Sequence, residues 1–272
     1  MLRGAGPLLR AAHIEPSLAV TLAAGALALG AGLGARTAAV VAAVGSGQLS
    51  IGWSNDWFDR RRDLAAGRTD KPIAQGRIGA RTVAAAAMTS AAACVVASLA
   101  LGPAAGPVHL LAVAAGWGYN LRAKRTWYSV VPWALAFGLL PAVVTLTTPV
   151  QRWPAPWLLI AGAVLGSGAH FANAIPDLDA DRATAVRGLP HRLGRRGSHI
   201  ATVALVGAGF AAVVAGLGDP VLGTVIAGLG GTGLIGVAYA LWSQRERLAF
   251  RLVTALLVLL AVLVVVAGSA LA

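Results

Sequence analysis

The chain has 272 residues, of which 57% are hydrophobic and only 12% are charged, and its mean hydropathy is +0.74. This balance excludes an ordinary cytosolic domain, in which about a quarter of the residues are charged. The formal net charge of +12 suggests a nucleic-acid partner at first sight. The positions of the basic residues indicate a different origin, which the predicted membrane topology explains.

Apolar runs recur along the whole chain, each near the roughly 20 residues that a helix needs to cross a bilayer. They predict membrane-spanning helices at 17–34, 38–55, 80–101, 104–120, 130–148, 156–174, 200–217, 219–241 and 249–271. The runs are continuous and rich in Ala, Leu, Val and Gly, which favours helices over the alternating pattern of a membrane β-barrel. The predicted fold class is therefore an all-α membrane protein with nine transmembrane helices.

The basic residues are distributed unevenly across the predicted membrane. Of the 22 Lys and Arg residues, 20 lie in the N-terminal segment or in the connecting segments 56–81, 121–129, 175–199 and 242–251, which all fall on one side. Only Arg36 and Arg152 fall on the other side. The positive-inside rule therefore predicts a multi-pass protein of the cell membrane with a cytoplasmic N-terminus, in contact with lipid and with no nucleic-acid partner.

Two polar stretches on the predicted cytoplasmic side repeat one pattern, N-x3-D-x3-D-x8-P-x3-G-R. The first copy consists of Asn55, Asp59, Asp63, Pro72, Gly76 and Arg77, and the second, 118 residues later, of Asn173, Asp177, Asp181, Pro190, Gly194 and Arg195. The offset covers four predicted spans, so both copies have the same orientation, as expected for a parallel duplication. We predict a single domain with two four-helix halves at about 17–125 and 130–245, plus a ninth helix at about 249–271.

The acidic residues of each copy are spaced to converge. Helical geometry of about 100° per residue places the Asn and the two Asp residues of either copy within an arc of about 80°. Asp56 lies a little outside the arc of the first copy, whereas Asp179 points to the far side in the second, where Pro176 can distort the helix. Grouped oxygen ligands without His or Cys suit Mg²⁺ rather than zinc, and they predict a polyanionic substrate.

Basic residues near both copies can neutralise a diphosphate as its bond to carbon breaks. These residues are Arg68, Lys71, Arg77, Lys124 and Arg187. For each of them, anchoring to lipid headgroups is an equally weighted alternative. A solvated loop is the alternative for one acidic stretch alone, but the duplication argues against it.

The acidic stretches resemble known motifs. Residues 55–63, NDWFDRRRD, resemble the NDxxDxxxD signature of the UbiA superfamily of intramembrane prenyltransferases, and residues 70–77, DKPIAQGR, resemble its RPLxSGR segment with lysine at the first position. Residues 177–181 and 189–194 resemble the second DxxxD motif and its TLPVRLG-like continuation, with Gly188 in place of threonine. Tyr119 and residues 124–126 resemble the Y…KR segment that follows the fourth helix of the family.

The resemblance covers most of the chain. It implies a bundle like the all-α isoprenoid synthases, with a lateral opening toward lipid, in which Mg²⁺ assists ionisation of a prenyl diphosphate and the prenyl group passes to an unidentified acceptor, expected to be aromatic. The implied catalytic residues are Asp59, Asp63, Asp177 and Asp181. The implied metal ligands are Asn55, Asp56, Asp59, Asp63, Asn173, Asp177 and Asp181. The implied diphosphate-binding residues are Arg68, Lys71, Tyr119 and Lys124.

Two groups near the cavity have open interpretations. His13 and Glu15 precede the first span and are candidates for the acceptor site, or equally for helix capping. The eight tryptophans lie near predicted span ends, as is typical of an interfacial belt, whereas lining of a prenyl pocket is the alternative for Trp53, Trp57 and Trp117.

Two other activities stay open. A membrane terpene cyclase of the same superfamily would use the same metal site without an acceptor, and the lining of the cavity would distinguish the two. A transporter built from duplicated halves is a less favoured alternative, because its carboxylates would lie well inside the spans rather than beside basic segments.

Overall fold

Nearly the whole chain is described by the computed structural model, which covers residues 5–184 and 186–266. All regular structure in these residues is helical. The helices of 17 to 30 residues are α2 (Ile14–Gly30), α3 (Arg36–Ala65), α4 (Ala80–Ala100), α5 (Ala105–Leu121), α6 (Val131–Thr147), α7 (Pro156–Ala174), α9 (Leu189–Leu217), α10 (Pro220–Trp242) and α11 (Glu246–Val266). Each predicted span coincides with one of these nine helices, which confirms the all-α fold class. Residues 267–271 of the ninth predicted span lie outside the described residues.

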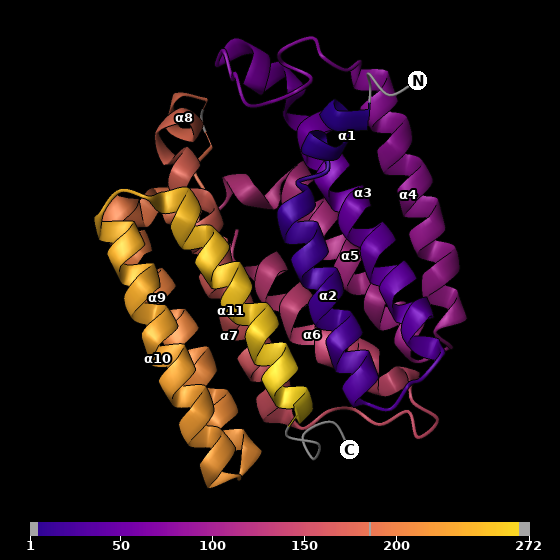
Figure 1. Ribbon diagram of the computed structural model, residues 1–272. Helices are drawn as coiled ribbons and strands as arrows, with labels where there is room; N and C mark the ends of the chain where they lie inside the picture. Colours follow the sequence, from indigo (N-terminus) through magenta and orange to yellow (C-terminus); the bar gives the residue numbers. More distant parts are fainter. Residues whose placement is uncertain (1–4, 185, 267–272) are drawn as a thin grey trace.

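Four shorter elements lie at the end of the bundle that also holds the start of α2. These are α1 (Ala5–Ala11), α8 (Leu178–Ala183) and the 3₁₀ turns η2 (Ala123–Arg125) and η3 (Ile175–Asp177). In Figure 1, α1 and α8 lie at the top of the bundle, and the yellow helix α11 ends at the bottom. The chain therefore runs from one end of the bundle to the other, as an odd number of spans requires.

Two of the long helices extend beyond their predicted spans. Helix α3 continues for ten residues past 55 through the first acidic stretch, so 56–65 is helical and not part of the predicted connecting segment. Helix α9 begins at Leu189, eleven residues before its predicted span, and contains a break at Gly194. The backbone of Gly194 has φ 70°, a conformation that glycine adopts without steric cost.

The long helices form a ring around a central cavity. Helices α2, α3, α5, α6, α7 and α11 provide nearly all of its wall, and α9 adds Val213. Helix α11 closes the ring because it packs against α2 as well as α10, and it also contacts α7 (Figure 1). Helix α4 packs on the outside of α3 and α5.

The lengths and compositions of the helices fit a membrane. Five described segments are long and apolar enough to cross a bilayer: α4, Pro156–Arg182, α9, α10 and α11. Helices α2 and α6 are apolar but only 17 residues long. The outer surface of α4 exposes Val96 and Leu99, and α10 exposes Ile235, as expected for side chains in contact with lipid.

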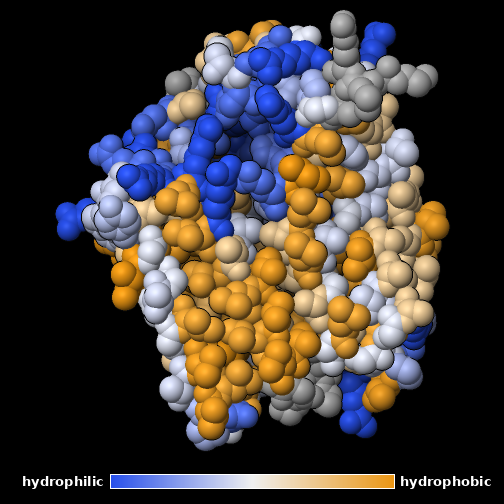
Figure 2. Space-filling view, in the orientation of Figure 1, coloured by the Kyte–Doolittle hydropathy of each residue, from blue (hydrophilic) through white to orange (hydrophobic). Residues whose placement is uncertain are grey.

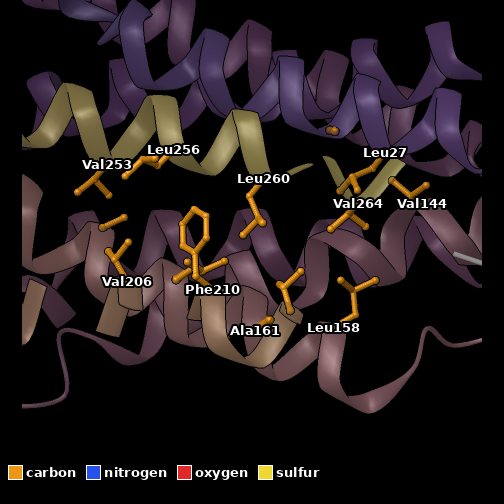
Figure 3. Close-up of a cluster of buried hydrophobic side chains, with 14 of the residues drawn as sticks. Leu27, Val144, Leu158, Ala161, Val206, Phe210, Val253, Leu256, Leu260 and Val264 are labelled. Atoms are coloured by element: carbon orange, nitrogen blue, oxygen red, sulfur yellow. The ribbon is translucent and has the colours of Figure 1, made fainter. Parts of the chain in front are cut away.

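The apolar interior of the bundle is organised around α11. Its buried residues Val253, Leu256, Leu260 and Val264 are spaced three or four apart, so they form one face of the helix. Figure 3 shows this face pointing toward α7 and α9 on one side, with Val264 close to α2 and α6 at the far end. Because lipid is as apolar as these side chains, close packing rather than exclusion of water stabilises this contact.

Glycine allows two particularly close approaches of the backbone. A side chain at Gly166 on α7 would meet the Trp133 carbonyl oxygen of α6 at 2.7 Å. A side chain at Gly52 on α3 would overlap the carbonyl oxygen of Ala12, at the corner between α1 and α2. Trp53 adds a hydrogen bond from its indole Nε1 to the Leu8 carbonyl at 2.9 Å, so α1 and the start of α2 are held against α3.

We expect Gly52→Ala to displace this corner and to lower the free energy of unfolding by about 1–3 kcal/mol, because the added methyl group has no room. Gly45→Ala on the same helix is the matched control, since its methyl group would meet Thr21 at an ordinary 3.5 Å. Thermal unfolding of both variants in detergent measures the difference. Equal stabilities would contradict the tight contact at Gly52.

Candidate active site

The central cavity is apolar along most of its length and polar at one end. The polar residues that line it are His13, Ser17, Gln48, Asn55, Tyr119, Asn120, Asn173 and Thr254. Asn55 and Asn173, the first residues of the two acidic motifs, both face this space. Figure 2 shows hydrophilic residues gathered around a hollow at this end, above a broad hydrophobic surface.

The first motif lies on the last turns of α3, where regular helical geometry holds its side chains on one face. Asp56, Asp59 and Asp63 are each 2% exposed. Asp59 accepts hydrogen bonds from Lys124 Nζ at 2.5 Å and from Arg62 Nη2 at 2.9 Å. The buried negative charge of Asp59 is therefore neutralised by one cation from η2 and one from its own helix.

Asn55 is oriented by Asn120, a residue of α5 with no predicted role. Asn55 Nδ2 donates to Asn120 Oδ1 at 3.0 Å, while Asn120 Nδ2 donates to the Ile51 carbonyl and to Ser54 Oγ, both at 2.9 Å. These bonds use the amide nitrogen of Asn55. Its carbonyl oxygen, the atom that suits a hard cation, is left for the cavity.

Asp56 belongs to a second charged group at the mouth of the cavity. Its Oδ1 accepts from Lys71 Nζ at 2.6 Å and lies 3.0 Å from His13 Nε2. Its Oδ2 is buried without a hydrogen-bond partner among the described residues. His13 lines the cavity, whereas Glu15 faces outward and pairs with Arg251.

The second motif is not on one continuous helix. Helix α7 ends at Ala174, and the chain passes through the 3₁₀ turn η3, which contains Pro176, before α8 begins. Because a proline inside a helix removes a backbone hydrogen bond, this interruption has a local cause. Asp177 consequently stays 40% exposed, and Asp179 points away from the site with 76% exposure, as its helical position predicts.

Arginine side chains connect the two motifs. Arg68 Nη2 lies 3.0 Å from Asp177 Oδ1 and also binds Asp70. Arg62 pairs with Asp59 of the first motif and with Asp181 of the second, at 3.4 Å. The structure thus brings together carboxylates from distant parts of the sequence, through cations rather than through direct contact.

Two histidines lie next to predicted site residues, His191 at Asp181 and His170 at Tyr119. His191 Nε2 lies 3.2 Å from Asp181 Oδ2, and neither motif pattern singles out this histidine. Tyr119, predicted to approach the diphosphate, lines the cavity with its ring 5.5 Å from that of His170 and 5.9 Å from that of Trp133. The position of Trp133 near a predicted span end favoured the membrane interface, whereas in the structure Trp133 lines the cavity.

The alternative pocket-lining role does not fit the other tryptophans. Trp53 donates its indole N–H to the backbone of α1, and Trp117 donates to Ser50 Oγ at 3.1 Å. Trp57 packs against Phe58 and lies under Arg60, 5.7 Å from ring centroid to guanidinium carbon. The wall of the cavity includes none of these three but does include Trp133 and Phe137 from α6.

Burial and nearby charges shift the pKa values of three ionisable side chains in the segments that connect the helices. Burial by itself would lower the pKa of Lys71, but the nearby carboxylates of Asp56, Asp63 and Asp177 together outweigh burial and raise it. Burial lowers the pKa of Lys124, although Asp59 opposes the shift. The hydrogen bonds from Arg68 hold the pKa of Asp70 well below its usual range.

The motif carboxylates are each paired with side-chain cations. Arg62 pairs with Asp59, Asp63 and Asp181. Asp56 pairs with Lys71, and Asp177 pairs with Arg68. In the described part of the chain, no three His, Cys, Asp or Glu side chains are close enough to hold a metal by themselves.

A known protein family matches most of the sequence. The sequence model described as the UbiA prenyltransferase family matches residues 17–263. No curated protein gives a match.

Solved structures share the fold. The apo structure of a UbiA homolog from Aeropyrum pernix K1 is similar with a TM-score of 0.71 and 23% identity, over 90% of this chain and 97% of that one. A UbiA homolog from Archaeoglobus fulgidus, bound to GPP and Mg²⁺, has a TM-score of 0.69 and 17% identity, over 96% and 99%. A structure concerning digeranylgeranylglyceryl phosphate synthase in membranes has a TM-score of 0.64 and 15% identity, over 100% and 99%.

We expect Asn120→Leu to lower the free energy of unfolding by about 1–3 kcal/mol, because Asn55 and Ser54 lose a buried partner. Asn120→Asp keeps the acceptor for Asn55 and tests whether that single bond is sufficient to hold the amide. Chemical unfolding in detergent measures both variants. Wild-type stability of Asn120→Leu would show that the amide pair contributes nothing.

Proposed function

The chain belongs to the UbiA prenyltransferase family, and we propose that it uses Mg²⁺ to ionise an isoprenoid diphosphate and transfers the prenyl group to an acceptor, expected to be aromatic. It is an enzyme of this family and a multi-pass integral membrane protein. The single observation that carries the proposal is the position of two acidic motifs, each with basic partners, at the polar end of a long apolar cavity.

The donor set supports Mg²⁺. The candidate ligands would coordinate a metal through carboxylate and amide oxygens, and none of them is His or Cys. They are Asn55, Asp56, Asp59, Asp63, Asn173, Asp177 and Asp181. The orientation of Asn55 and the unpartnered Oδ2 of Asp56 leave such oxygens available. When bound, Mg²⁺ supplies stabilisation of the negative charge that develops on the leaving diphosphate.

The basic residues support diphosphate binding at the same end. Arg68 and Lys71 come from the segment between α3 and α4, Lys124 comes from η2, and all three contact motif carboxylates. As the C–O bond of the substrate breaks, its electron pair moves to the diphosphate, and these cations stabilise the added charge in a largely buried place. Tyr119 lines the cavity beside them and presents a donor hydroxyl group or an electron-rich ring.

The apolar length of the cavity supports a prenyl chain as the other part of the substrate. Leu165 and Ala161 of α7 and Leu27 of α2 line it at increasing distance from the motifs. Between Asn173 and Ala161 the rise of α7 amounts to about 18 Å, at 1.5 Å per residue. A hydrocarbon chain lying along this wall would be shielded from water while its diphosphate stays at the polar end.

The lining favours transfer over cyclisation. His13, Ser17 and Gln48 give the α2 and α3 wall hydrogen-bonding groups that a hydrocarbon does not need, and these suit a polar acceptor. The aromatic rings of Tyr119, Trp133 and Phe137 lie on the α5 and α6 wall, where they can stabilise an allylic cation, and Phe250 adds one ring from α11. A cavity sealed by aromatic rings on all sides would favour a cyclase. The lining of this cavity instead combines a polar wall with an aromatic one.

The uneven distribution of Lys and Arg supports a cytoplasmic position for the motif end of the bundle. On the same basis, the acidic motifs and the diphosphate lie at the cytoplasmic surface. The halves at about 17–125 and 130–245 stay a proposal from the repeated motif.

We expect Asp59→Asn and Asp177→Asn each to reduce Mg²⁺-dependent diphosphate release from geranylgeranyl diphosphate by about 10²-fold or more, because each removes a carboxylate ligand of the metal that stabilises the leaving group. Asp179→Asn is the matched control, since Asp179 is exposed and directed away from the site. Pyrophosphate release measures all three. Unchanged rates in Asp59→Asn and Asp177→Asn would refute metal-assisted ionisation.

A panel of prenyl diphosphates, incubated with Mg²⁺ and with or without aromatic acceptors, tests the transfer step. Mass spectrometry of the products should show a prenylated acceptor that forms only when both substrates are present. A cyclic hydrocarbon or alcohol made from the diphosphate and Mg²⁺ alone would replace the transferase proposal by a cyclase.

A further inference from the structure

Arg62 differs from the other cations of the site in its position. Its Nη2 lies 2.9 Å from Asp59 Oδ2 and 3.6 Å from Asp63 Oδ1, and its Nη1 lies 3.4 Å from Asp181 Oδ1. Among the described residues, it is the one side chain ion-paired with candidate metal ligands from both motifs. Arg68 pairs with Asp177 and otherwise with Asp70, which is not one of these candidates. Its guanidinium group therefore lies where negative charge from α3 and α8 converges.

Three consecutive arginines on α3 have three different environments. Arg60 donates to the Trp57 carbonyl and lies over the Trp57 ring. Arg61 is exposed. Only Arg62, with 15% of its side chain exposed, turns inward to the carboxylates. The next residue, Asp63, is fully turned inward, so the helix face rather than local charge decides which arginine enters the site.

The contacts of Arg62 are incomplete. Its Nη1 is buried and makes no hydrogen bond in the described part of the chain, because the approach to Asp181 does not have hydrogen-bond geometry. A guanidinium group has five donors in a planar fork and favours two parallel bonds to a carboxylate or phosphate. Arg62 is therefore held by charge more than by hydrogen bonding, and a phosphate would satisfy it better.

The carboxylates also need a cation at this position. Asp59 and Asp63 are 2% exposed, and charges of one sign so close together and so far from water are unfavourable without compensation. A divalent cation arriving alone would have to displace Arg62 and leave the guanidinium group without an anionic partner. A cation arriving with a diphosphate brings that partner with it.

The geometry points to Arg62 as an internal counter-cation that occupies the space between the two motifs, weakens binding of free metal, and transfers its hydrogen bonds to the diphosphate when metal and diphosphate bind together. This inference rests on the proposed function, because it assumes that the motifs bind a metal. It makes the affinities for metal and for diphosphate mutually dependent, so each ligand strengthens binding of the other.

Binding of Mn²⁺ to the full-length protein in detergent, followed by electron paramagnetic resonance without any diphosphate, tests the first part. Arg62→Leu should bind Mn²⁺ about tenfold more tightly than the wild type, a typical size for coupling between sites. Arg61→Leu removes the same charge from the exposed neighbouring position and should change the affinity by no more than about twofold. Arg62→Lys, which keeps the charge, should resemble the wild type.

Binding of inorganic pyrophosphate in the presence of saturating Mn²⁺ tests the second part. Here Arg62→Leu should bind about tenfold more weakly, because a charge-assisted donor to phosphate is lost. If the role of Arg62 were merely structural, the variant would bind both Mn²⁺ and pyrophosphate more weakly. Opposite changes in the two affinities are therefore the signature of the inference, and Arg62→Gln provides the same comparison if Arg62→Leu does not fold.

Two outcomes separate this inference from the proposed function. If Asp59→Asn and Asp181→Asn weaken Mn²⁺ binding but Arg62→Leu does not strengthen it, the motifs bind metal and the counter-cation role is wrong. If the two Asp variants leave Mn²⁺ binding unchanged, the metal site itself fails, and the proposed function fails with it.

Discussion

Negative charge buried at one end of an apolar helical bundle is the constraint on which the rest of this site depends. Asp56, Asp59 and Asp63 lie almost entirely out of water on one helix, and carboxylates in such a place are stable only with paired cations. The cations come from the loop after α3, from η2 and from α3 itself. Charge neutralisation therefore draws elements that are distant in the sequence to the same end of the molecule.

The same pairing joins the two acidic motifs. Arg62 and Arg68 reach from the first half of the chain to Asp181 and Asp177 in the second. Close packing does the corresponding work in the apolar part of the bundle, where α11 fills the space between α2 and α7. The polar end is thus held by charges that a ligand can rearrange, whereas the cavity wall is held by contacts that stay the same.

This division suits a substrate with a charged head and a hydrocarbon tail. Asn55 and Asn173 lie at the boundary between the two parts, since they begin the acidic motifs and also line the cavity. A diphosphate that replaces carboxylate–cation pairs by metal and phosphate contacts would leave the net charge balance of the site similar. The geometry of the bound chain below it would depend on the shape of an already packed cavity.

Hydropathy and residue spacing along the chain determined the nine spans, the side on which charge accumulates and the two acidic motifs. These are properties of a single segment or of two segments compared, so they are visible without a three-dimensional arrangement. The helical face of Asp179 was predictable for the same reason. The ends of the helices were less predictable, because the last turns of α3 are polar and do not stand out in hydropathy from a connecting segment.

Only the tertiary structure decided which side chains complete the motifs. Three successive arginines look alike in the sequence, yet Arg62 alone meets carboxylates of both halves, and Asn120 and His191 have roles that no motif indicates. The choice depends on which helix faces meet and on how Pro176 redirects the chain after α7. Which side chains contact the motif residues depends on distances in space, and the linear sequence determines these distances only through the packing of the whole bundle.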